Sequence, residues 1–131
     1  MGDPSETHGA FSWVELLTAD PEAAKKFYVE LFGWELAGSP VAGEDYTVAK
    51  VAGKPVAGIM KMPPEVPPGV PPHWGVFVTV DDVDATVTKA QELGAQVARA
   101  PTDVPGVGRF AVLRDPQGAI FAIIHYEKSP R

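Results

Sequence analysis

The sequence predicts an α+β fold in which one βαβββ module is followed by a second. A strand, a capped helix and a terminating glycine occur twice, with the candidate caps Asp20 and Asp81 separated by 81 − 20 = 61 residues. From each cap to its glycine, Gly33 or Gly94, the distance is 13 residues (33 − 20 and 94 − 81). Each half then continues with short apolar segments bounded by turn-forming residues, which is typical of strands. Two βαβββ units account for both halves.

The first half begins with a strand at residues 11–17, in which both alternating faces are apolar. Asp20 can cap the following helix, and Pro21 suits its first turn. An apolar stripe at i, i+3, i+4 and i+7 spacing runs through Ala24, Phe27, Tyr28 and Leu31. Gly33 can adopt the left-handed conformation that ends many helices. We therefore expect a helix over residues 21–31.

Hairpins are expected at the end of each half. In the first half, residues 52–55 (Ala-Gly-Lys-Pro) have a turn composition between strand candidates at 45–51 and 56–61. In the second half, residues 115–118 (Asp-Pro-Gln-Gly) place Pro and Gly where a type I turn favours them. The other predicted elements are strands at 34–36, 75–80, 96–98, 109–113 and 119–126, with a helix at 83–93 capped by Asp81 or Asp82.

A proline-rich segment at residues 63–72 separates the two halves. It can be neither a helix nor an inner strand, so we expect an extended, polyproline-like spacer. Each half alone would bury little apolar surface, which argues against two independent domains. We therefore predict a single domain over residues 1–131, with module one at about 11–62 and module two at about 73–126.

Composition narrows the function classes. The chain of 131 residues has 45% hydrophobic and 21% charged residues, an ordinary globular balance, and no cysteine, which excludes disulfides and thiolate chemistry. Its net charge of −6 disfavours binding to nucleic acid or anionic membranes. The polar, acidic start lacks the basic and apolar regions of a signal peptide, and no apolar run is long enough to span a bilayer. A cytoplasmic location is expected.

Four stretches carry a resemblance to a known family: residues 13–20, the Phe-Tyr pair and the Leu-Phe-Gly-Trp tetrapeptide within 27–34, residues 78–84, and Arg-Asp-Pro-Gln-Gly at 114–118. They are similar to the vicinal-oxygen-chelate superfamily, which includes glyoxalases, bleomycin resistance proteins and dioxygenases. The resemblance covers residues 11–126. It implies that the modules form a curved, cup-shaped mixed sheet, with helices on the convex face and a ligand pocket in the concavity.

Enzymes of this superfamily hold a divalent metal through His, Gln or Glu from both modules. The resemblance places the equivalent positions at Trp13, Gly58, Gly75 and Ala122, none of which can bind a metal. Among the histidines, His8 is expected to be solvated in the N-terminal arm and His125 to face away from the cup. His73 can point toward the pocket mouth, but His73 and Glu15 together are too few ligands for a closed site. We predict no metal and no cofactor.

Glu15 is the residue that differs most from its surroundings. It lies in an apolar strand, and its parity with Trp13 places it in the same concavity. A carboxylate there is paired, bonded to a ligand or partly protonated. It either serves function or braces the fold, for example through a salt bridge to Arg109. The predicted ligand-binding residues are Trp13, Glu15, Tyr46, His73, Phe77, Arg109, Phe110 and Phe121, although core packing is an alternative role for each aromatic residue and a solvated turn charge for Arg109.

Two functions from different classes remain open. The first is a metal-free protein that binds or sequesters a small molecule through aromatic residues and Glu15. The second is a glyoxalase-like lyase or isomerase in which Glu15 is a general base acting on a small carbonyl compound. A domain that only mediates oligomerisation is a third reading. The ligand's identity is not written in the sequence. Because open sheet edges are usually covered, we also predict a homodimer, with Trp13, Trp74 or the proline segment near the contact.

Overall fold

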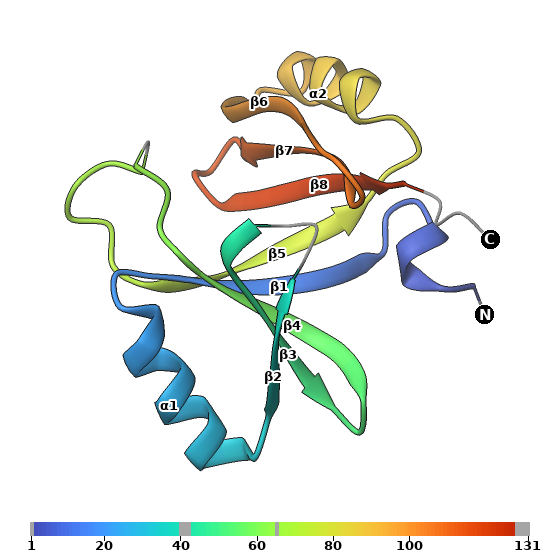
Figure 1. Cartoon of the computed structure of the whole chain (residues 1–131). Coiled ribbons are helices and arrows are strands. Elements are labelled where there is room, and N and C mark those ends of the chain that lie inside the picture. Colours follow the sequence, from blue (N-terminus) through green and yellow to red (C-terminus); the bar gives the residue numbers. More distant parts are fainter. Residues whose placement is uncertain (1, 40–42, 65, 128–131) are drawn as a thin grey trace. The chain divides into compact units, whose positions relative to one another are not determined.

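The elements follow the predicted order in a computed structural model, which describes residues 2–39, 43–64 and 66–127 (Figure 1). A short 3₁₀ helix, η1 (Pro4–Glu6), precedes the first module. The remaining elements are β1 (Phe11–Thr18), α1 (Pro21–Phe32), β2 (Glu35–Ser39), β3 (Gly43–Val51), β4 (Lys54–Lys61), β5 (His73–Thr79), α2 (Val83–Glu92), β6 (Gln96–Val104), β7 (Gly108–Arg114) and β8 (Ile120–Tyr126).

The chain divides into two compact units. The module-one unit is Trp13–Gly75, and the module-two unit is Met1–Ser12 with Val76–Arg131. Strand order is β2-β3-β4-β1 in the first and β5-β8-β7-β6 in the second. In each, one parallel pair (β1 with β4, or β5 with β8) adjoins antiparallel pairs. The predicted α+β class, with duplicated βαβββ modules and mixed strand pairing, is confirmed.

Both helices begin at the predicted aspartates. The Asp20 carboxylate accepts a hydrogen bond from the Ala23 N–H at 3.1 Å, and the Asp82 carboxylate, rather than that of Asp81, accepts from the Ala85 N–H at 3.0 Å. Gly33 ends α1 with φ 73°, a conformation that glycine adopts without steric cost. Local capping chemistry therefore sets the helix boundaries.

The first hairpin and the strand predicted at 96–98 have other bounds in the structure. The first hairpin turns on Ala52 and Gly53 alone, both at positive φ (52° and 77°), so Lys54 and Pro55 belong to β4. The strand predicted at 96–98 extends to Val104, because pairing with β7 continues through two register shifts. Cross-strand pairing thus lengthens strands beyond what local composition indicates.

The proline segment is not the extended spacer that its composition predicts. Among the described residues of 63–72 there is no helix or strand, as expected, and residue 65 lies outside the described residues. Two backbone hydrogen bonds, Val66 N–H to Pro63 O (3.1 Å) and Val70 N–H to Pro67 O (3.4 Å), fold the segment into successive turns. Proline supplies the fixed φ that begins a turn as readily as it supports an extended chain.

The N-terminal arm is bound to the module-two unit. The Gly9 N–H donates to the Thr79 carbonyl at 2.7 Å, and the Thr79 N–H donates to the Ala10 carbonyl at 2.8 Å. His8 was expected to be solvated, but its Nδ1 accepts the Asp81 N–H at 2.9 Å, although the side chain stays 55% exposed. No helix in the described part of the chain is long and apolar enough to cross a membrane.

The module-two core lies between α2 and its sheet (Figure 1). Its buried members are Val80, Val83, Val87, Ala111, Leu113 and Ile123. In the module-one unit, α1 lies against β4, and none of the residues of α1 is buried. The buried apolar side chains of this unit are Leu16, Ala49, Ala57 and Ile59, each at most 5% exposed. Their neighbours of opposite parity therefore occupy the other sheet face.

Candidate functional site

Glu15 and Gly58 share one face of the module-one sheet. The parallel pairing of β1 with β4 places Glu15 beside Gly58 and Leu16 beside Ile59. Ile59 is 0% exposed, so its face is sealed. Alternation along the strands puts Glu15 and Gly58 on the opposite face, which Tyr46 joins through its pairing with Met60. Residues distant in sequence thus meet on one surface.

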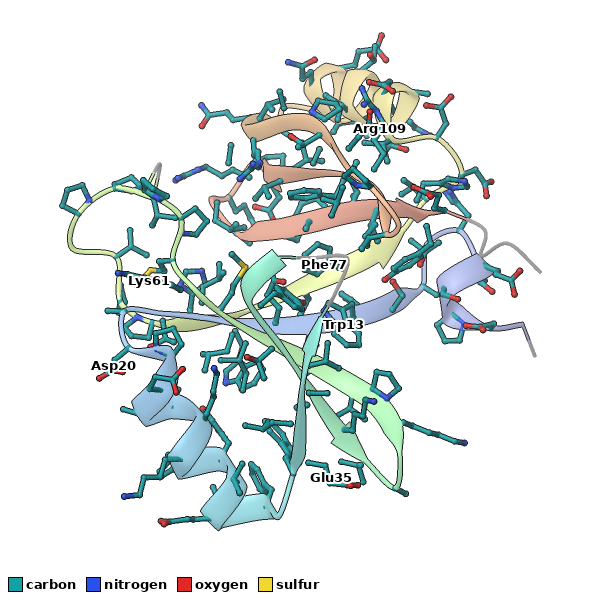
Figure 2. The ribbon with its side chains drawn as sticks, viewed as in Figure 1. Trp13, Asp20, Glu35, Lys61, Phe77 and Arg109 are labelled. Carbon is teal, nitrogen blue, oxygen red and sulfur yellow. The ribbon has the colours of Figure 1, made fainter. Side chains whose placement is uncertain are left out.

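Three side chains on this face form a hydrogen-bonded chain, Trp13–Tyr46–Glu15. The indole N–H of Trp13 donates to the Tyr46 hydroxyl oxygen at 2.7 Å. The same hydroxyl is hydrogen-bonded to the Glu15 side chain. An ionised carboxylate can only accept, so Tyr46 is the donor in its hydrogen bond with the ionised form of Glu15, consistent with its lowering of the Glu15 pKa. Trp13 is labelled on β1 in Figure 2. Glu15 follows it two residues later on the same strand.

Tyr46 fills the space that a side chain at position 58 would occupy. A Cβ built on Gly58 would collide with the Tyr46 hydroxyl oxygen and Cζ, and would lie 2.8 Å from Cε1. Gly75 lies on the other side of β1, where a Cβ would be 3.9 Å from the Glu15 carbonyl oxygen. Trp13, Gly58 and Gly75 therefore lie near Glu15 within the module-one unit, whereas Ala122 belongs to the module-two unit.

The environment of Glu15 disfavours its charged form. Burial raises the pKa of the Glu15 carboxyl above its ordinary value of 4.5, and the hydrogen bond from Tyr46 partly opposes that rise. The side chain nevertheless keeps some contact with solvent. A carboxylate retained at such a place costs stability, which is a physical reason to regard it as a functional candidate.

The residues at this site do not fit a metal ion. Trp13, Gly58 and Gly75 offer no oxygen or imidazole side chain as a ligand. No group of three or more His, Cys, Asp or Glu side chains that could hold a metal is found among the described residues. His73, the other candidate ligand of this unit, has its Nδ1 within 2.9 Å of the Pro71 carbonyl oxygen.

Phe77 and Phe110 lie together on one face of the module-two sheet. Phe77 pairs with Ala122 and Phe110 with Ile124, and their ring centroids are 6.3 Å apart. The Arg99 guanidinium carbon lies 5.3 Å from the centroid of the Phe110 ring. Phe121 has the opposite parity and packs against the core beneath α2. We therefore leave Phe121 out of the candidate site.

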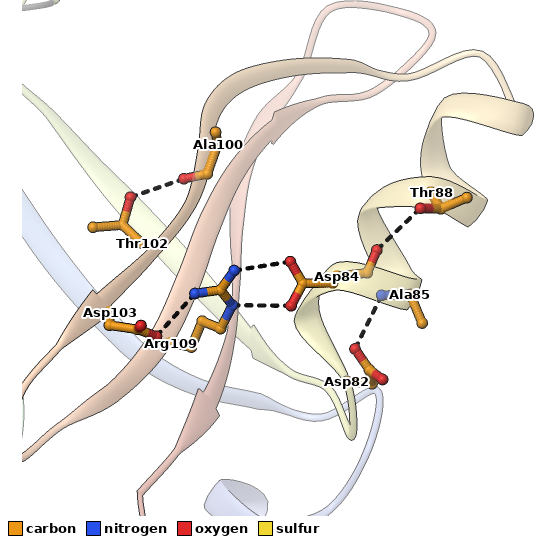
Figure 3. A network of polar contacts seen from close by, with 8 residues as sticks. All are labelled: Asp82, Asp84, Ala85, Thr88, Ala100, Thr102, Asp103 and Arg109. Atoms are coloured by element: carbon orange, nitrogen blue, oxygen red, sulfur yellow. Dashed lines mark hydrogen bonds and ion pairs between the residues drawn. The ribbon is translucent and has the colours of Figure 1, made fainter.

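Arg109 lies on the α2 side of the same sheet. Its Nε and Nη2 donate to the two Asp84 oxygens at 3.0 and 2.9 Å, and its Nη1 donates to Asp103 at 3.0 Å (Figure 3). The guanidinium lowers the pKa of the Asp84 carboxyl. A salt bridge between Glu15 and Arg109 was considered from the sequence, but the partners of Arg109 are Asp84 and Asp103. These ion pairs connect the first turn of α2 to the β6–β7 hairpin. This arrangement favours a structural role.

Sequence reasoning did not find the polar role of Tyr46. It predicted Tyr46 only as an aromatic contact, because nothing in residues 43–51 shows that its hydroxyl reaches two β1 side chains. The one sequence feature that pointed to this contact was Gly58, a glycine inside a predicted strand. In the structure it is buried and its φ is not positive. Glycine within a strand often marks close approach by another group, and here that group is the Tyr46 ring.

Two curated relatives are similar over most of this chain. "Putative glyoxylase CFP32" of Mycobacterium tuberculosis is 47% identical over 117 residues, which are 88% of this chain and 44% of that protein. "Anthracycline biosynthesis protein DnrV" of Streptomyces peucetius is 40% identical over 116 residues, 88% of this chain and 41% of that protein. The chain thus spans less than half the length of these relatives.

A solved structure shares the fold. A variant of Streptomyces coelicolor methylmalonyl-CoA epimerase, in complex with 2-nitronate-propionyl-CoA, matches with a TM-score of 0.66 at 17% identity, over 93% of this chain and 100% of the epimerase. A family model described as the Glyoxalase/Bleomycin resistance protein/Dioxygenase superfamily matches residues 10–123. The chain therefore belongs to the glyoxalase/bleomycin resistance protein/dioxygenase superfamily, as its sequence resemblance predicts.

Proposed function

We propose that this chain binds a small molecule without a metal ion, through the face of the module-one sheet that carries Glu15. The observation behind this proposal is the Trp13–Tyr46–Glu15 chain beside a side-chain-free Gly58. The face offers one partly buried carboxyl group flanked by aromatic rings, which suits ligand recognition.

The arrangement at Gly58 supports metal independence. A ligating side chain at this position would have to displace Tyr46 and break the hydrogen bond from Trp13. The relatives' names support a small organic ligand, since one is called a glyoxylase and another an anthracycline biosynthesis protein. Among the remaining candidates, His73, Phe77 and Phe110 stay predicted ligand contacts.

A second candidate function is catalysis, as a glyoxalase-like lyase or isomerase with Glu15 as the general base. The raised pKa of Glu15 favours this reading, because a base works best when its pKa approaches the ambient pH. Against it, the N–H of Trp13 and the O–H of Tyr46 already donate within the chain. A developing enolate would find no free donor from these two groups.

Mass spectrometry of small molecules that copurify with the protein tests the binding function. Glu15→Gln and Trp13→Ala are expected to lose the copurifying molecule, whereas Glu35→Gln, an exposed carboxylate on β2, keeps it. Elemental analysis of protein purified without chelators tests metal independence, and one equivalent of metal lost in Glu15→Gln contradicts it. Turnover of the recovered molecule by the native protein, absent in Glu15→Gln, selects the enzymatic candidate.

We further propose that the chain forms a homodimer. Support comes from an aromatic cluster around α1, made of Phe27, Tyr28, Phe32, Trp34 and Trp74, whose neighbouring ring centroids lie 5.0 to 6.2 Å apart. Phe27 is 57% and Phe32 59% exposed, and contiguous exposed apolar surface commonly marks an interface. Sedimentation equilibrium is expected to show a dimer that Phe32→Ser dissociates. Leu93→Ser, 70% exposed on the module-two unit, is the control.

A further inference from the structure

We infer that Tyr46 is the positioning residue of this site, and that it orients Glu15 to accept a hydrogen bond from a protonated amine on a flat, apolar ligand. This inference rests on the proposed binding function and adds both the residue that sets the geometry and the chemical class of the ligand. It follows from the direction in which the hydrogen bonds of the chain run.

The two hydrogen bonds of the chain run in one direction, from Trp13 to Tyr46 and from Tyr46 to Glu15. The Trp13 N–H is an indole donor with no acceptor capacity, and it donates to Tyr46 at 2.7 Å. The hydrogen bond with Tyr46 lowers the pKa of Glu15, which means that the Tyr46 hydroxyl is the donor to the ionised carboxylate. The chain therefore ends at a carboxylate that still has lone pairs to offer.

The group that this site offers to a ligand is a hydrogen-bond acceptor, the Glu15 carboxylate. The Trp13 N–H and the Tyr46 O–H already donate within the chain. A carboxylate or phosphate ligand group would gain no hydrogen bond from them and would face the Glu15 charge. An ammonium group would gain a charge-assisted hydrogen bond and would stabilise the ionised form of Glu15. The net charge of −6 also favours a cation over an anion.

The remaining surface of the chain is aromatic. With their polar atoms engaged, Trp13 and Tyr46 present ring faces, which attract flat apolar groups and cations. Gly58 completes the arrangement, because any side chain there would displace the Tyr46 ring from its place beside β4. The position of Tyr46 thus depends on Gly58, and the orientation of Glu15 depends on Tyr46.

The ligand class can be tested with three probes that share a phenyl ring: phenethylamine, 2-phenylethanol and 3-phenylpropanoate. Shifts of the Trp13 indole N–H signal in NMR spectra, assigned with Trp13→Phe, report binding. We expect affinity to fall from the amine to the alcohol to the carboxylate, and Glu15→Gln to abolish the preference for the amine. Stronger or equal binding of the carboxylate, or no shift with any probe, overturns the ligand class.

The positioning role is tested by Tyr46→Phe, which keeps the ring and removes the hydroxyl. Affinity for phenethylamine is expected to fall by about 3- to 10-fold, which corresponds to the loss of one hydrogen bond. The NMR-measured pKa of Glu15 is expected to rise further, because the bond that lowers it is gone. Tyr28→Phe removes the hydroxyl that accepts the Trp74 indole N–H at 3.2 Å, and it should change neither quantity.

The outcomes separate this inference from the proposed function. If Glu15→Gln loses the copurifying molecule but Tyr46→Phe matches Tyr28→Phe in affinity and in the pKa of Glu15, the binding site stands and the positioning role fails. If Glu15→Gln keeps that molecule while Tyr46→Phe still raises the pKa of Glu15, the hydrogen-bonded chain is real but serves the fold, and both proposals fail.

Discussion

Replacing Gly58 with alanine tests the packing on which the site depends. The added methyl group would collide with the Tyr46 hydroxyl oxygen and Cζ and would lie 2.8 Å from Cε1. Gly58 is buried on β4 between β1 and β3, so the strand backbone has little freedom to retreat. Relief therefore requires the Tyr46 ring to move, and that movement breaks its hydrogen bond with Trp13.

The expected loss of stability combines three contributions. Overpacking costs about 1–3 kcal/mol, and a lost hydrogen bond costs about 0.5–1.5 kcal/mol. Alanine restricts the unfolded chain and returns about 0.4–1 kcal/mol. The net destabilisation is about 2 kcal/mol, within a range of roughly 0.5 to 4 kcal/mol.

Urea unfolding followed by circular dichroism measures this change. Gly38→Ala is the matched control, because Gly38 also lies on a module-one strand and a Cβ there meets nothing within 4 Å. It should be neutral or stabilise by up to about 1 kcal/mol. In a Tyr46→Leu background, which lacks the far end of the ring, Gly58→Ala should cost far less. Equal stabilities of Gly58→Ala and Gly38→Ala in the native background would refute the argument.

Three further changes have defined outcomes. Glu15→Gln should raise the melting temperature at neutral pH, because burial raises the pKa of Glu15 and the charged carboxylate therefore destabilises the folded state. The gain in melting temperature should shrink as pH falls toward 4.5, where the carboxyl becomes protonated in both states. A gain that does not change with pH would exclude the Glu15 charge as its cause. Asp84→Asn should lower the melting temperature at neutral pH, because it removes the ion pair with Arg109. The difference in melting temperature from wild type should vanish as pH falls through the lowered pKa of Asp84. A difference that acid does not affect would rule out the ion pair as its cause. Asp82→Ala should cost about 1 kcal/mol in urea unfolding through the lost cap of α2, whereas Asp81→Ala, outside the cap, should cost less.

The fold was predictable because its signals are local. Caps, glycine stops and turn residues act over three or four positions, and α1 and α2 begin at the predicted residues. Two of the predictions that failed have different causes, a cross-strand pairing in one and local hydrogen bonds in the other. Pairing with β7 carries β6 to Val104, and the proline segment makes two turns instead of an extended run.

The site was predictable only in part. Strand parity placed Glu15 and Trp13 on one face from the sequence alone. Phe121 was predicted as a ligand contact, but it packs against the module-two core. Arg109 shows the limit of such reasoning. Its charge suggested a ligand contact, but its partners are two aspartates, Asp84 on α2 and Asp103 on β6, and the choice among acidic residues depends on which strands and helices come together.

The sequence by itself determined the modules, the cap of α1, the family and the lack of metal-ligating residues at the expected positions, and it left the cap of α2 between Asp81 and Asp82. Only the tertiary structure decided that Tyr46 occupies the space beside Gly58 and Glu15. The contact of Tyr46 with Gly58 and its bonds to Trp13 and Glu15 join β3, β4 and β1, and strand register decides which side chains meet. A register shift of one residue would place Tyr46 on the opposite face of the sheet, and the composition of the strands does not specify the register.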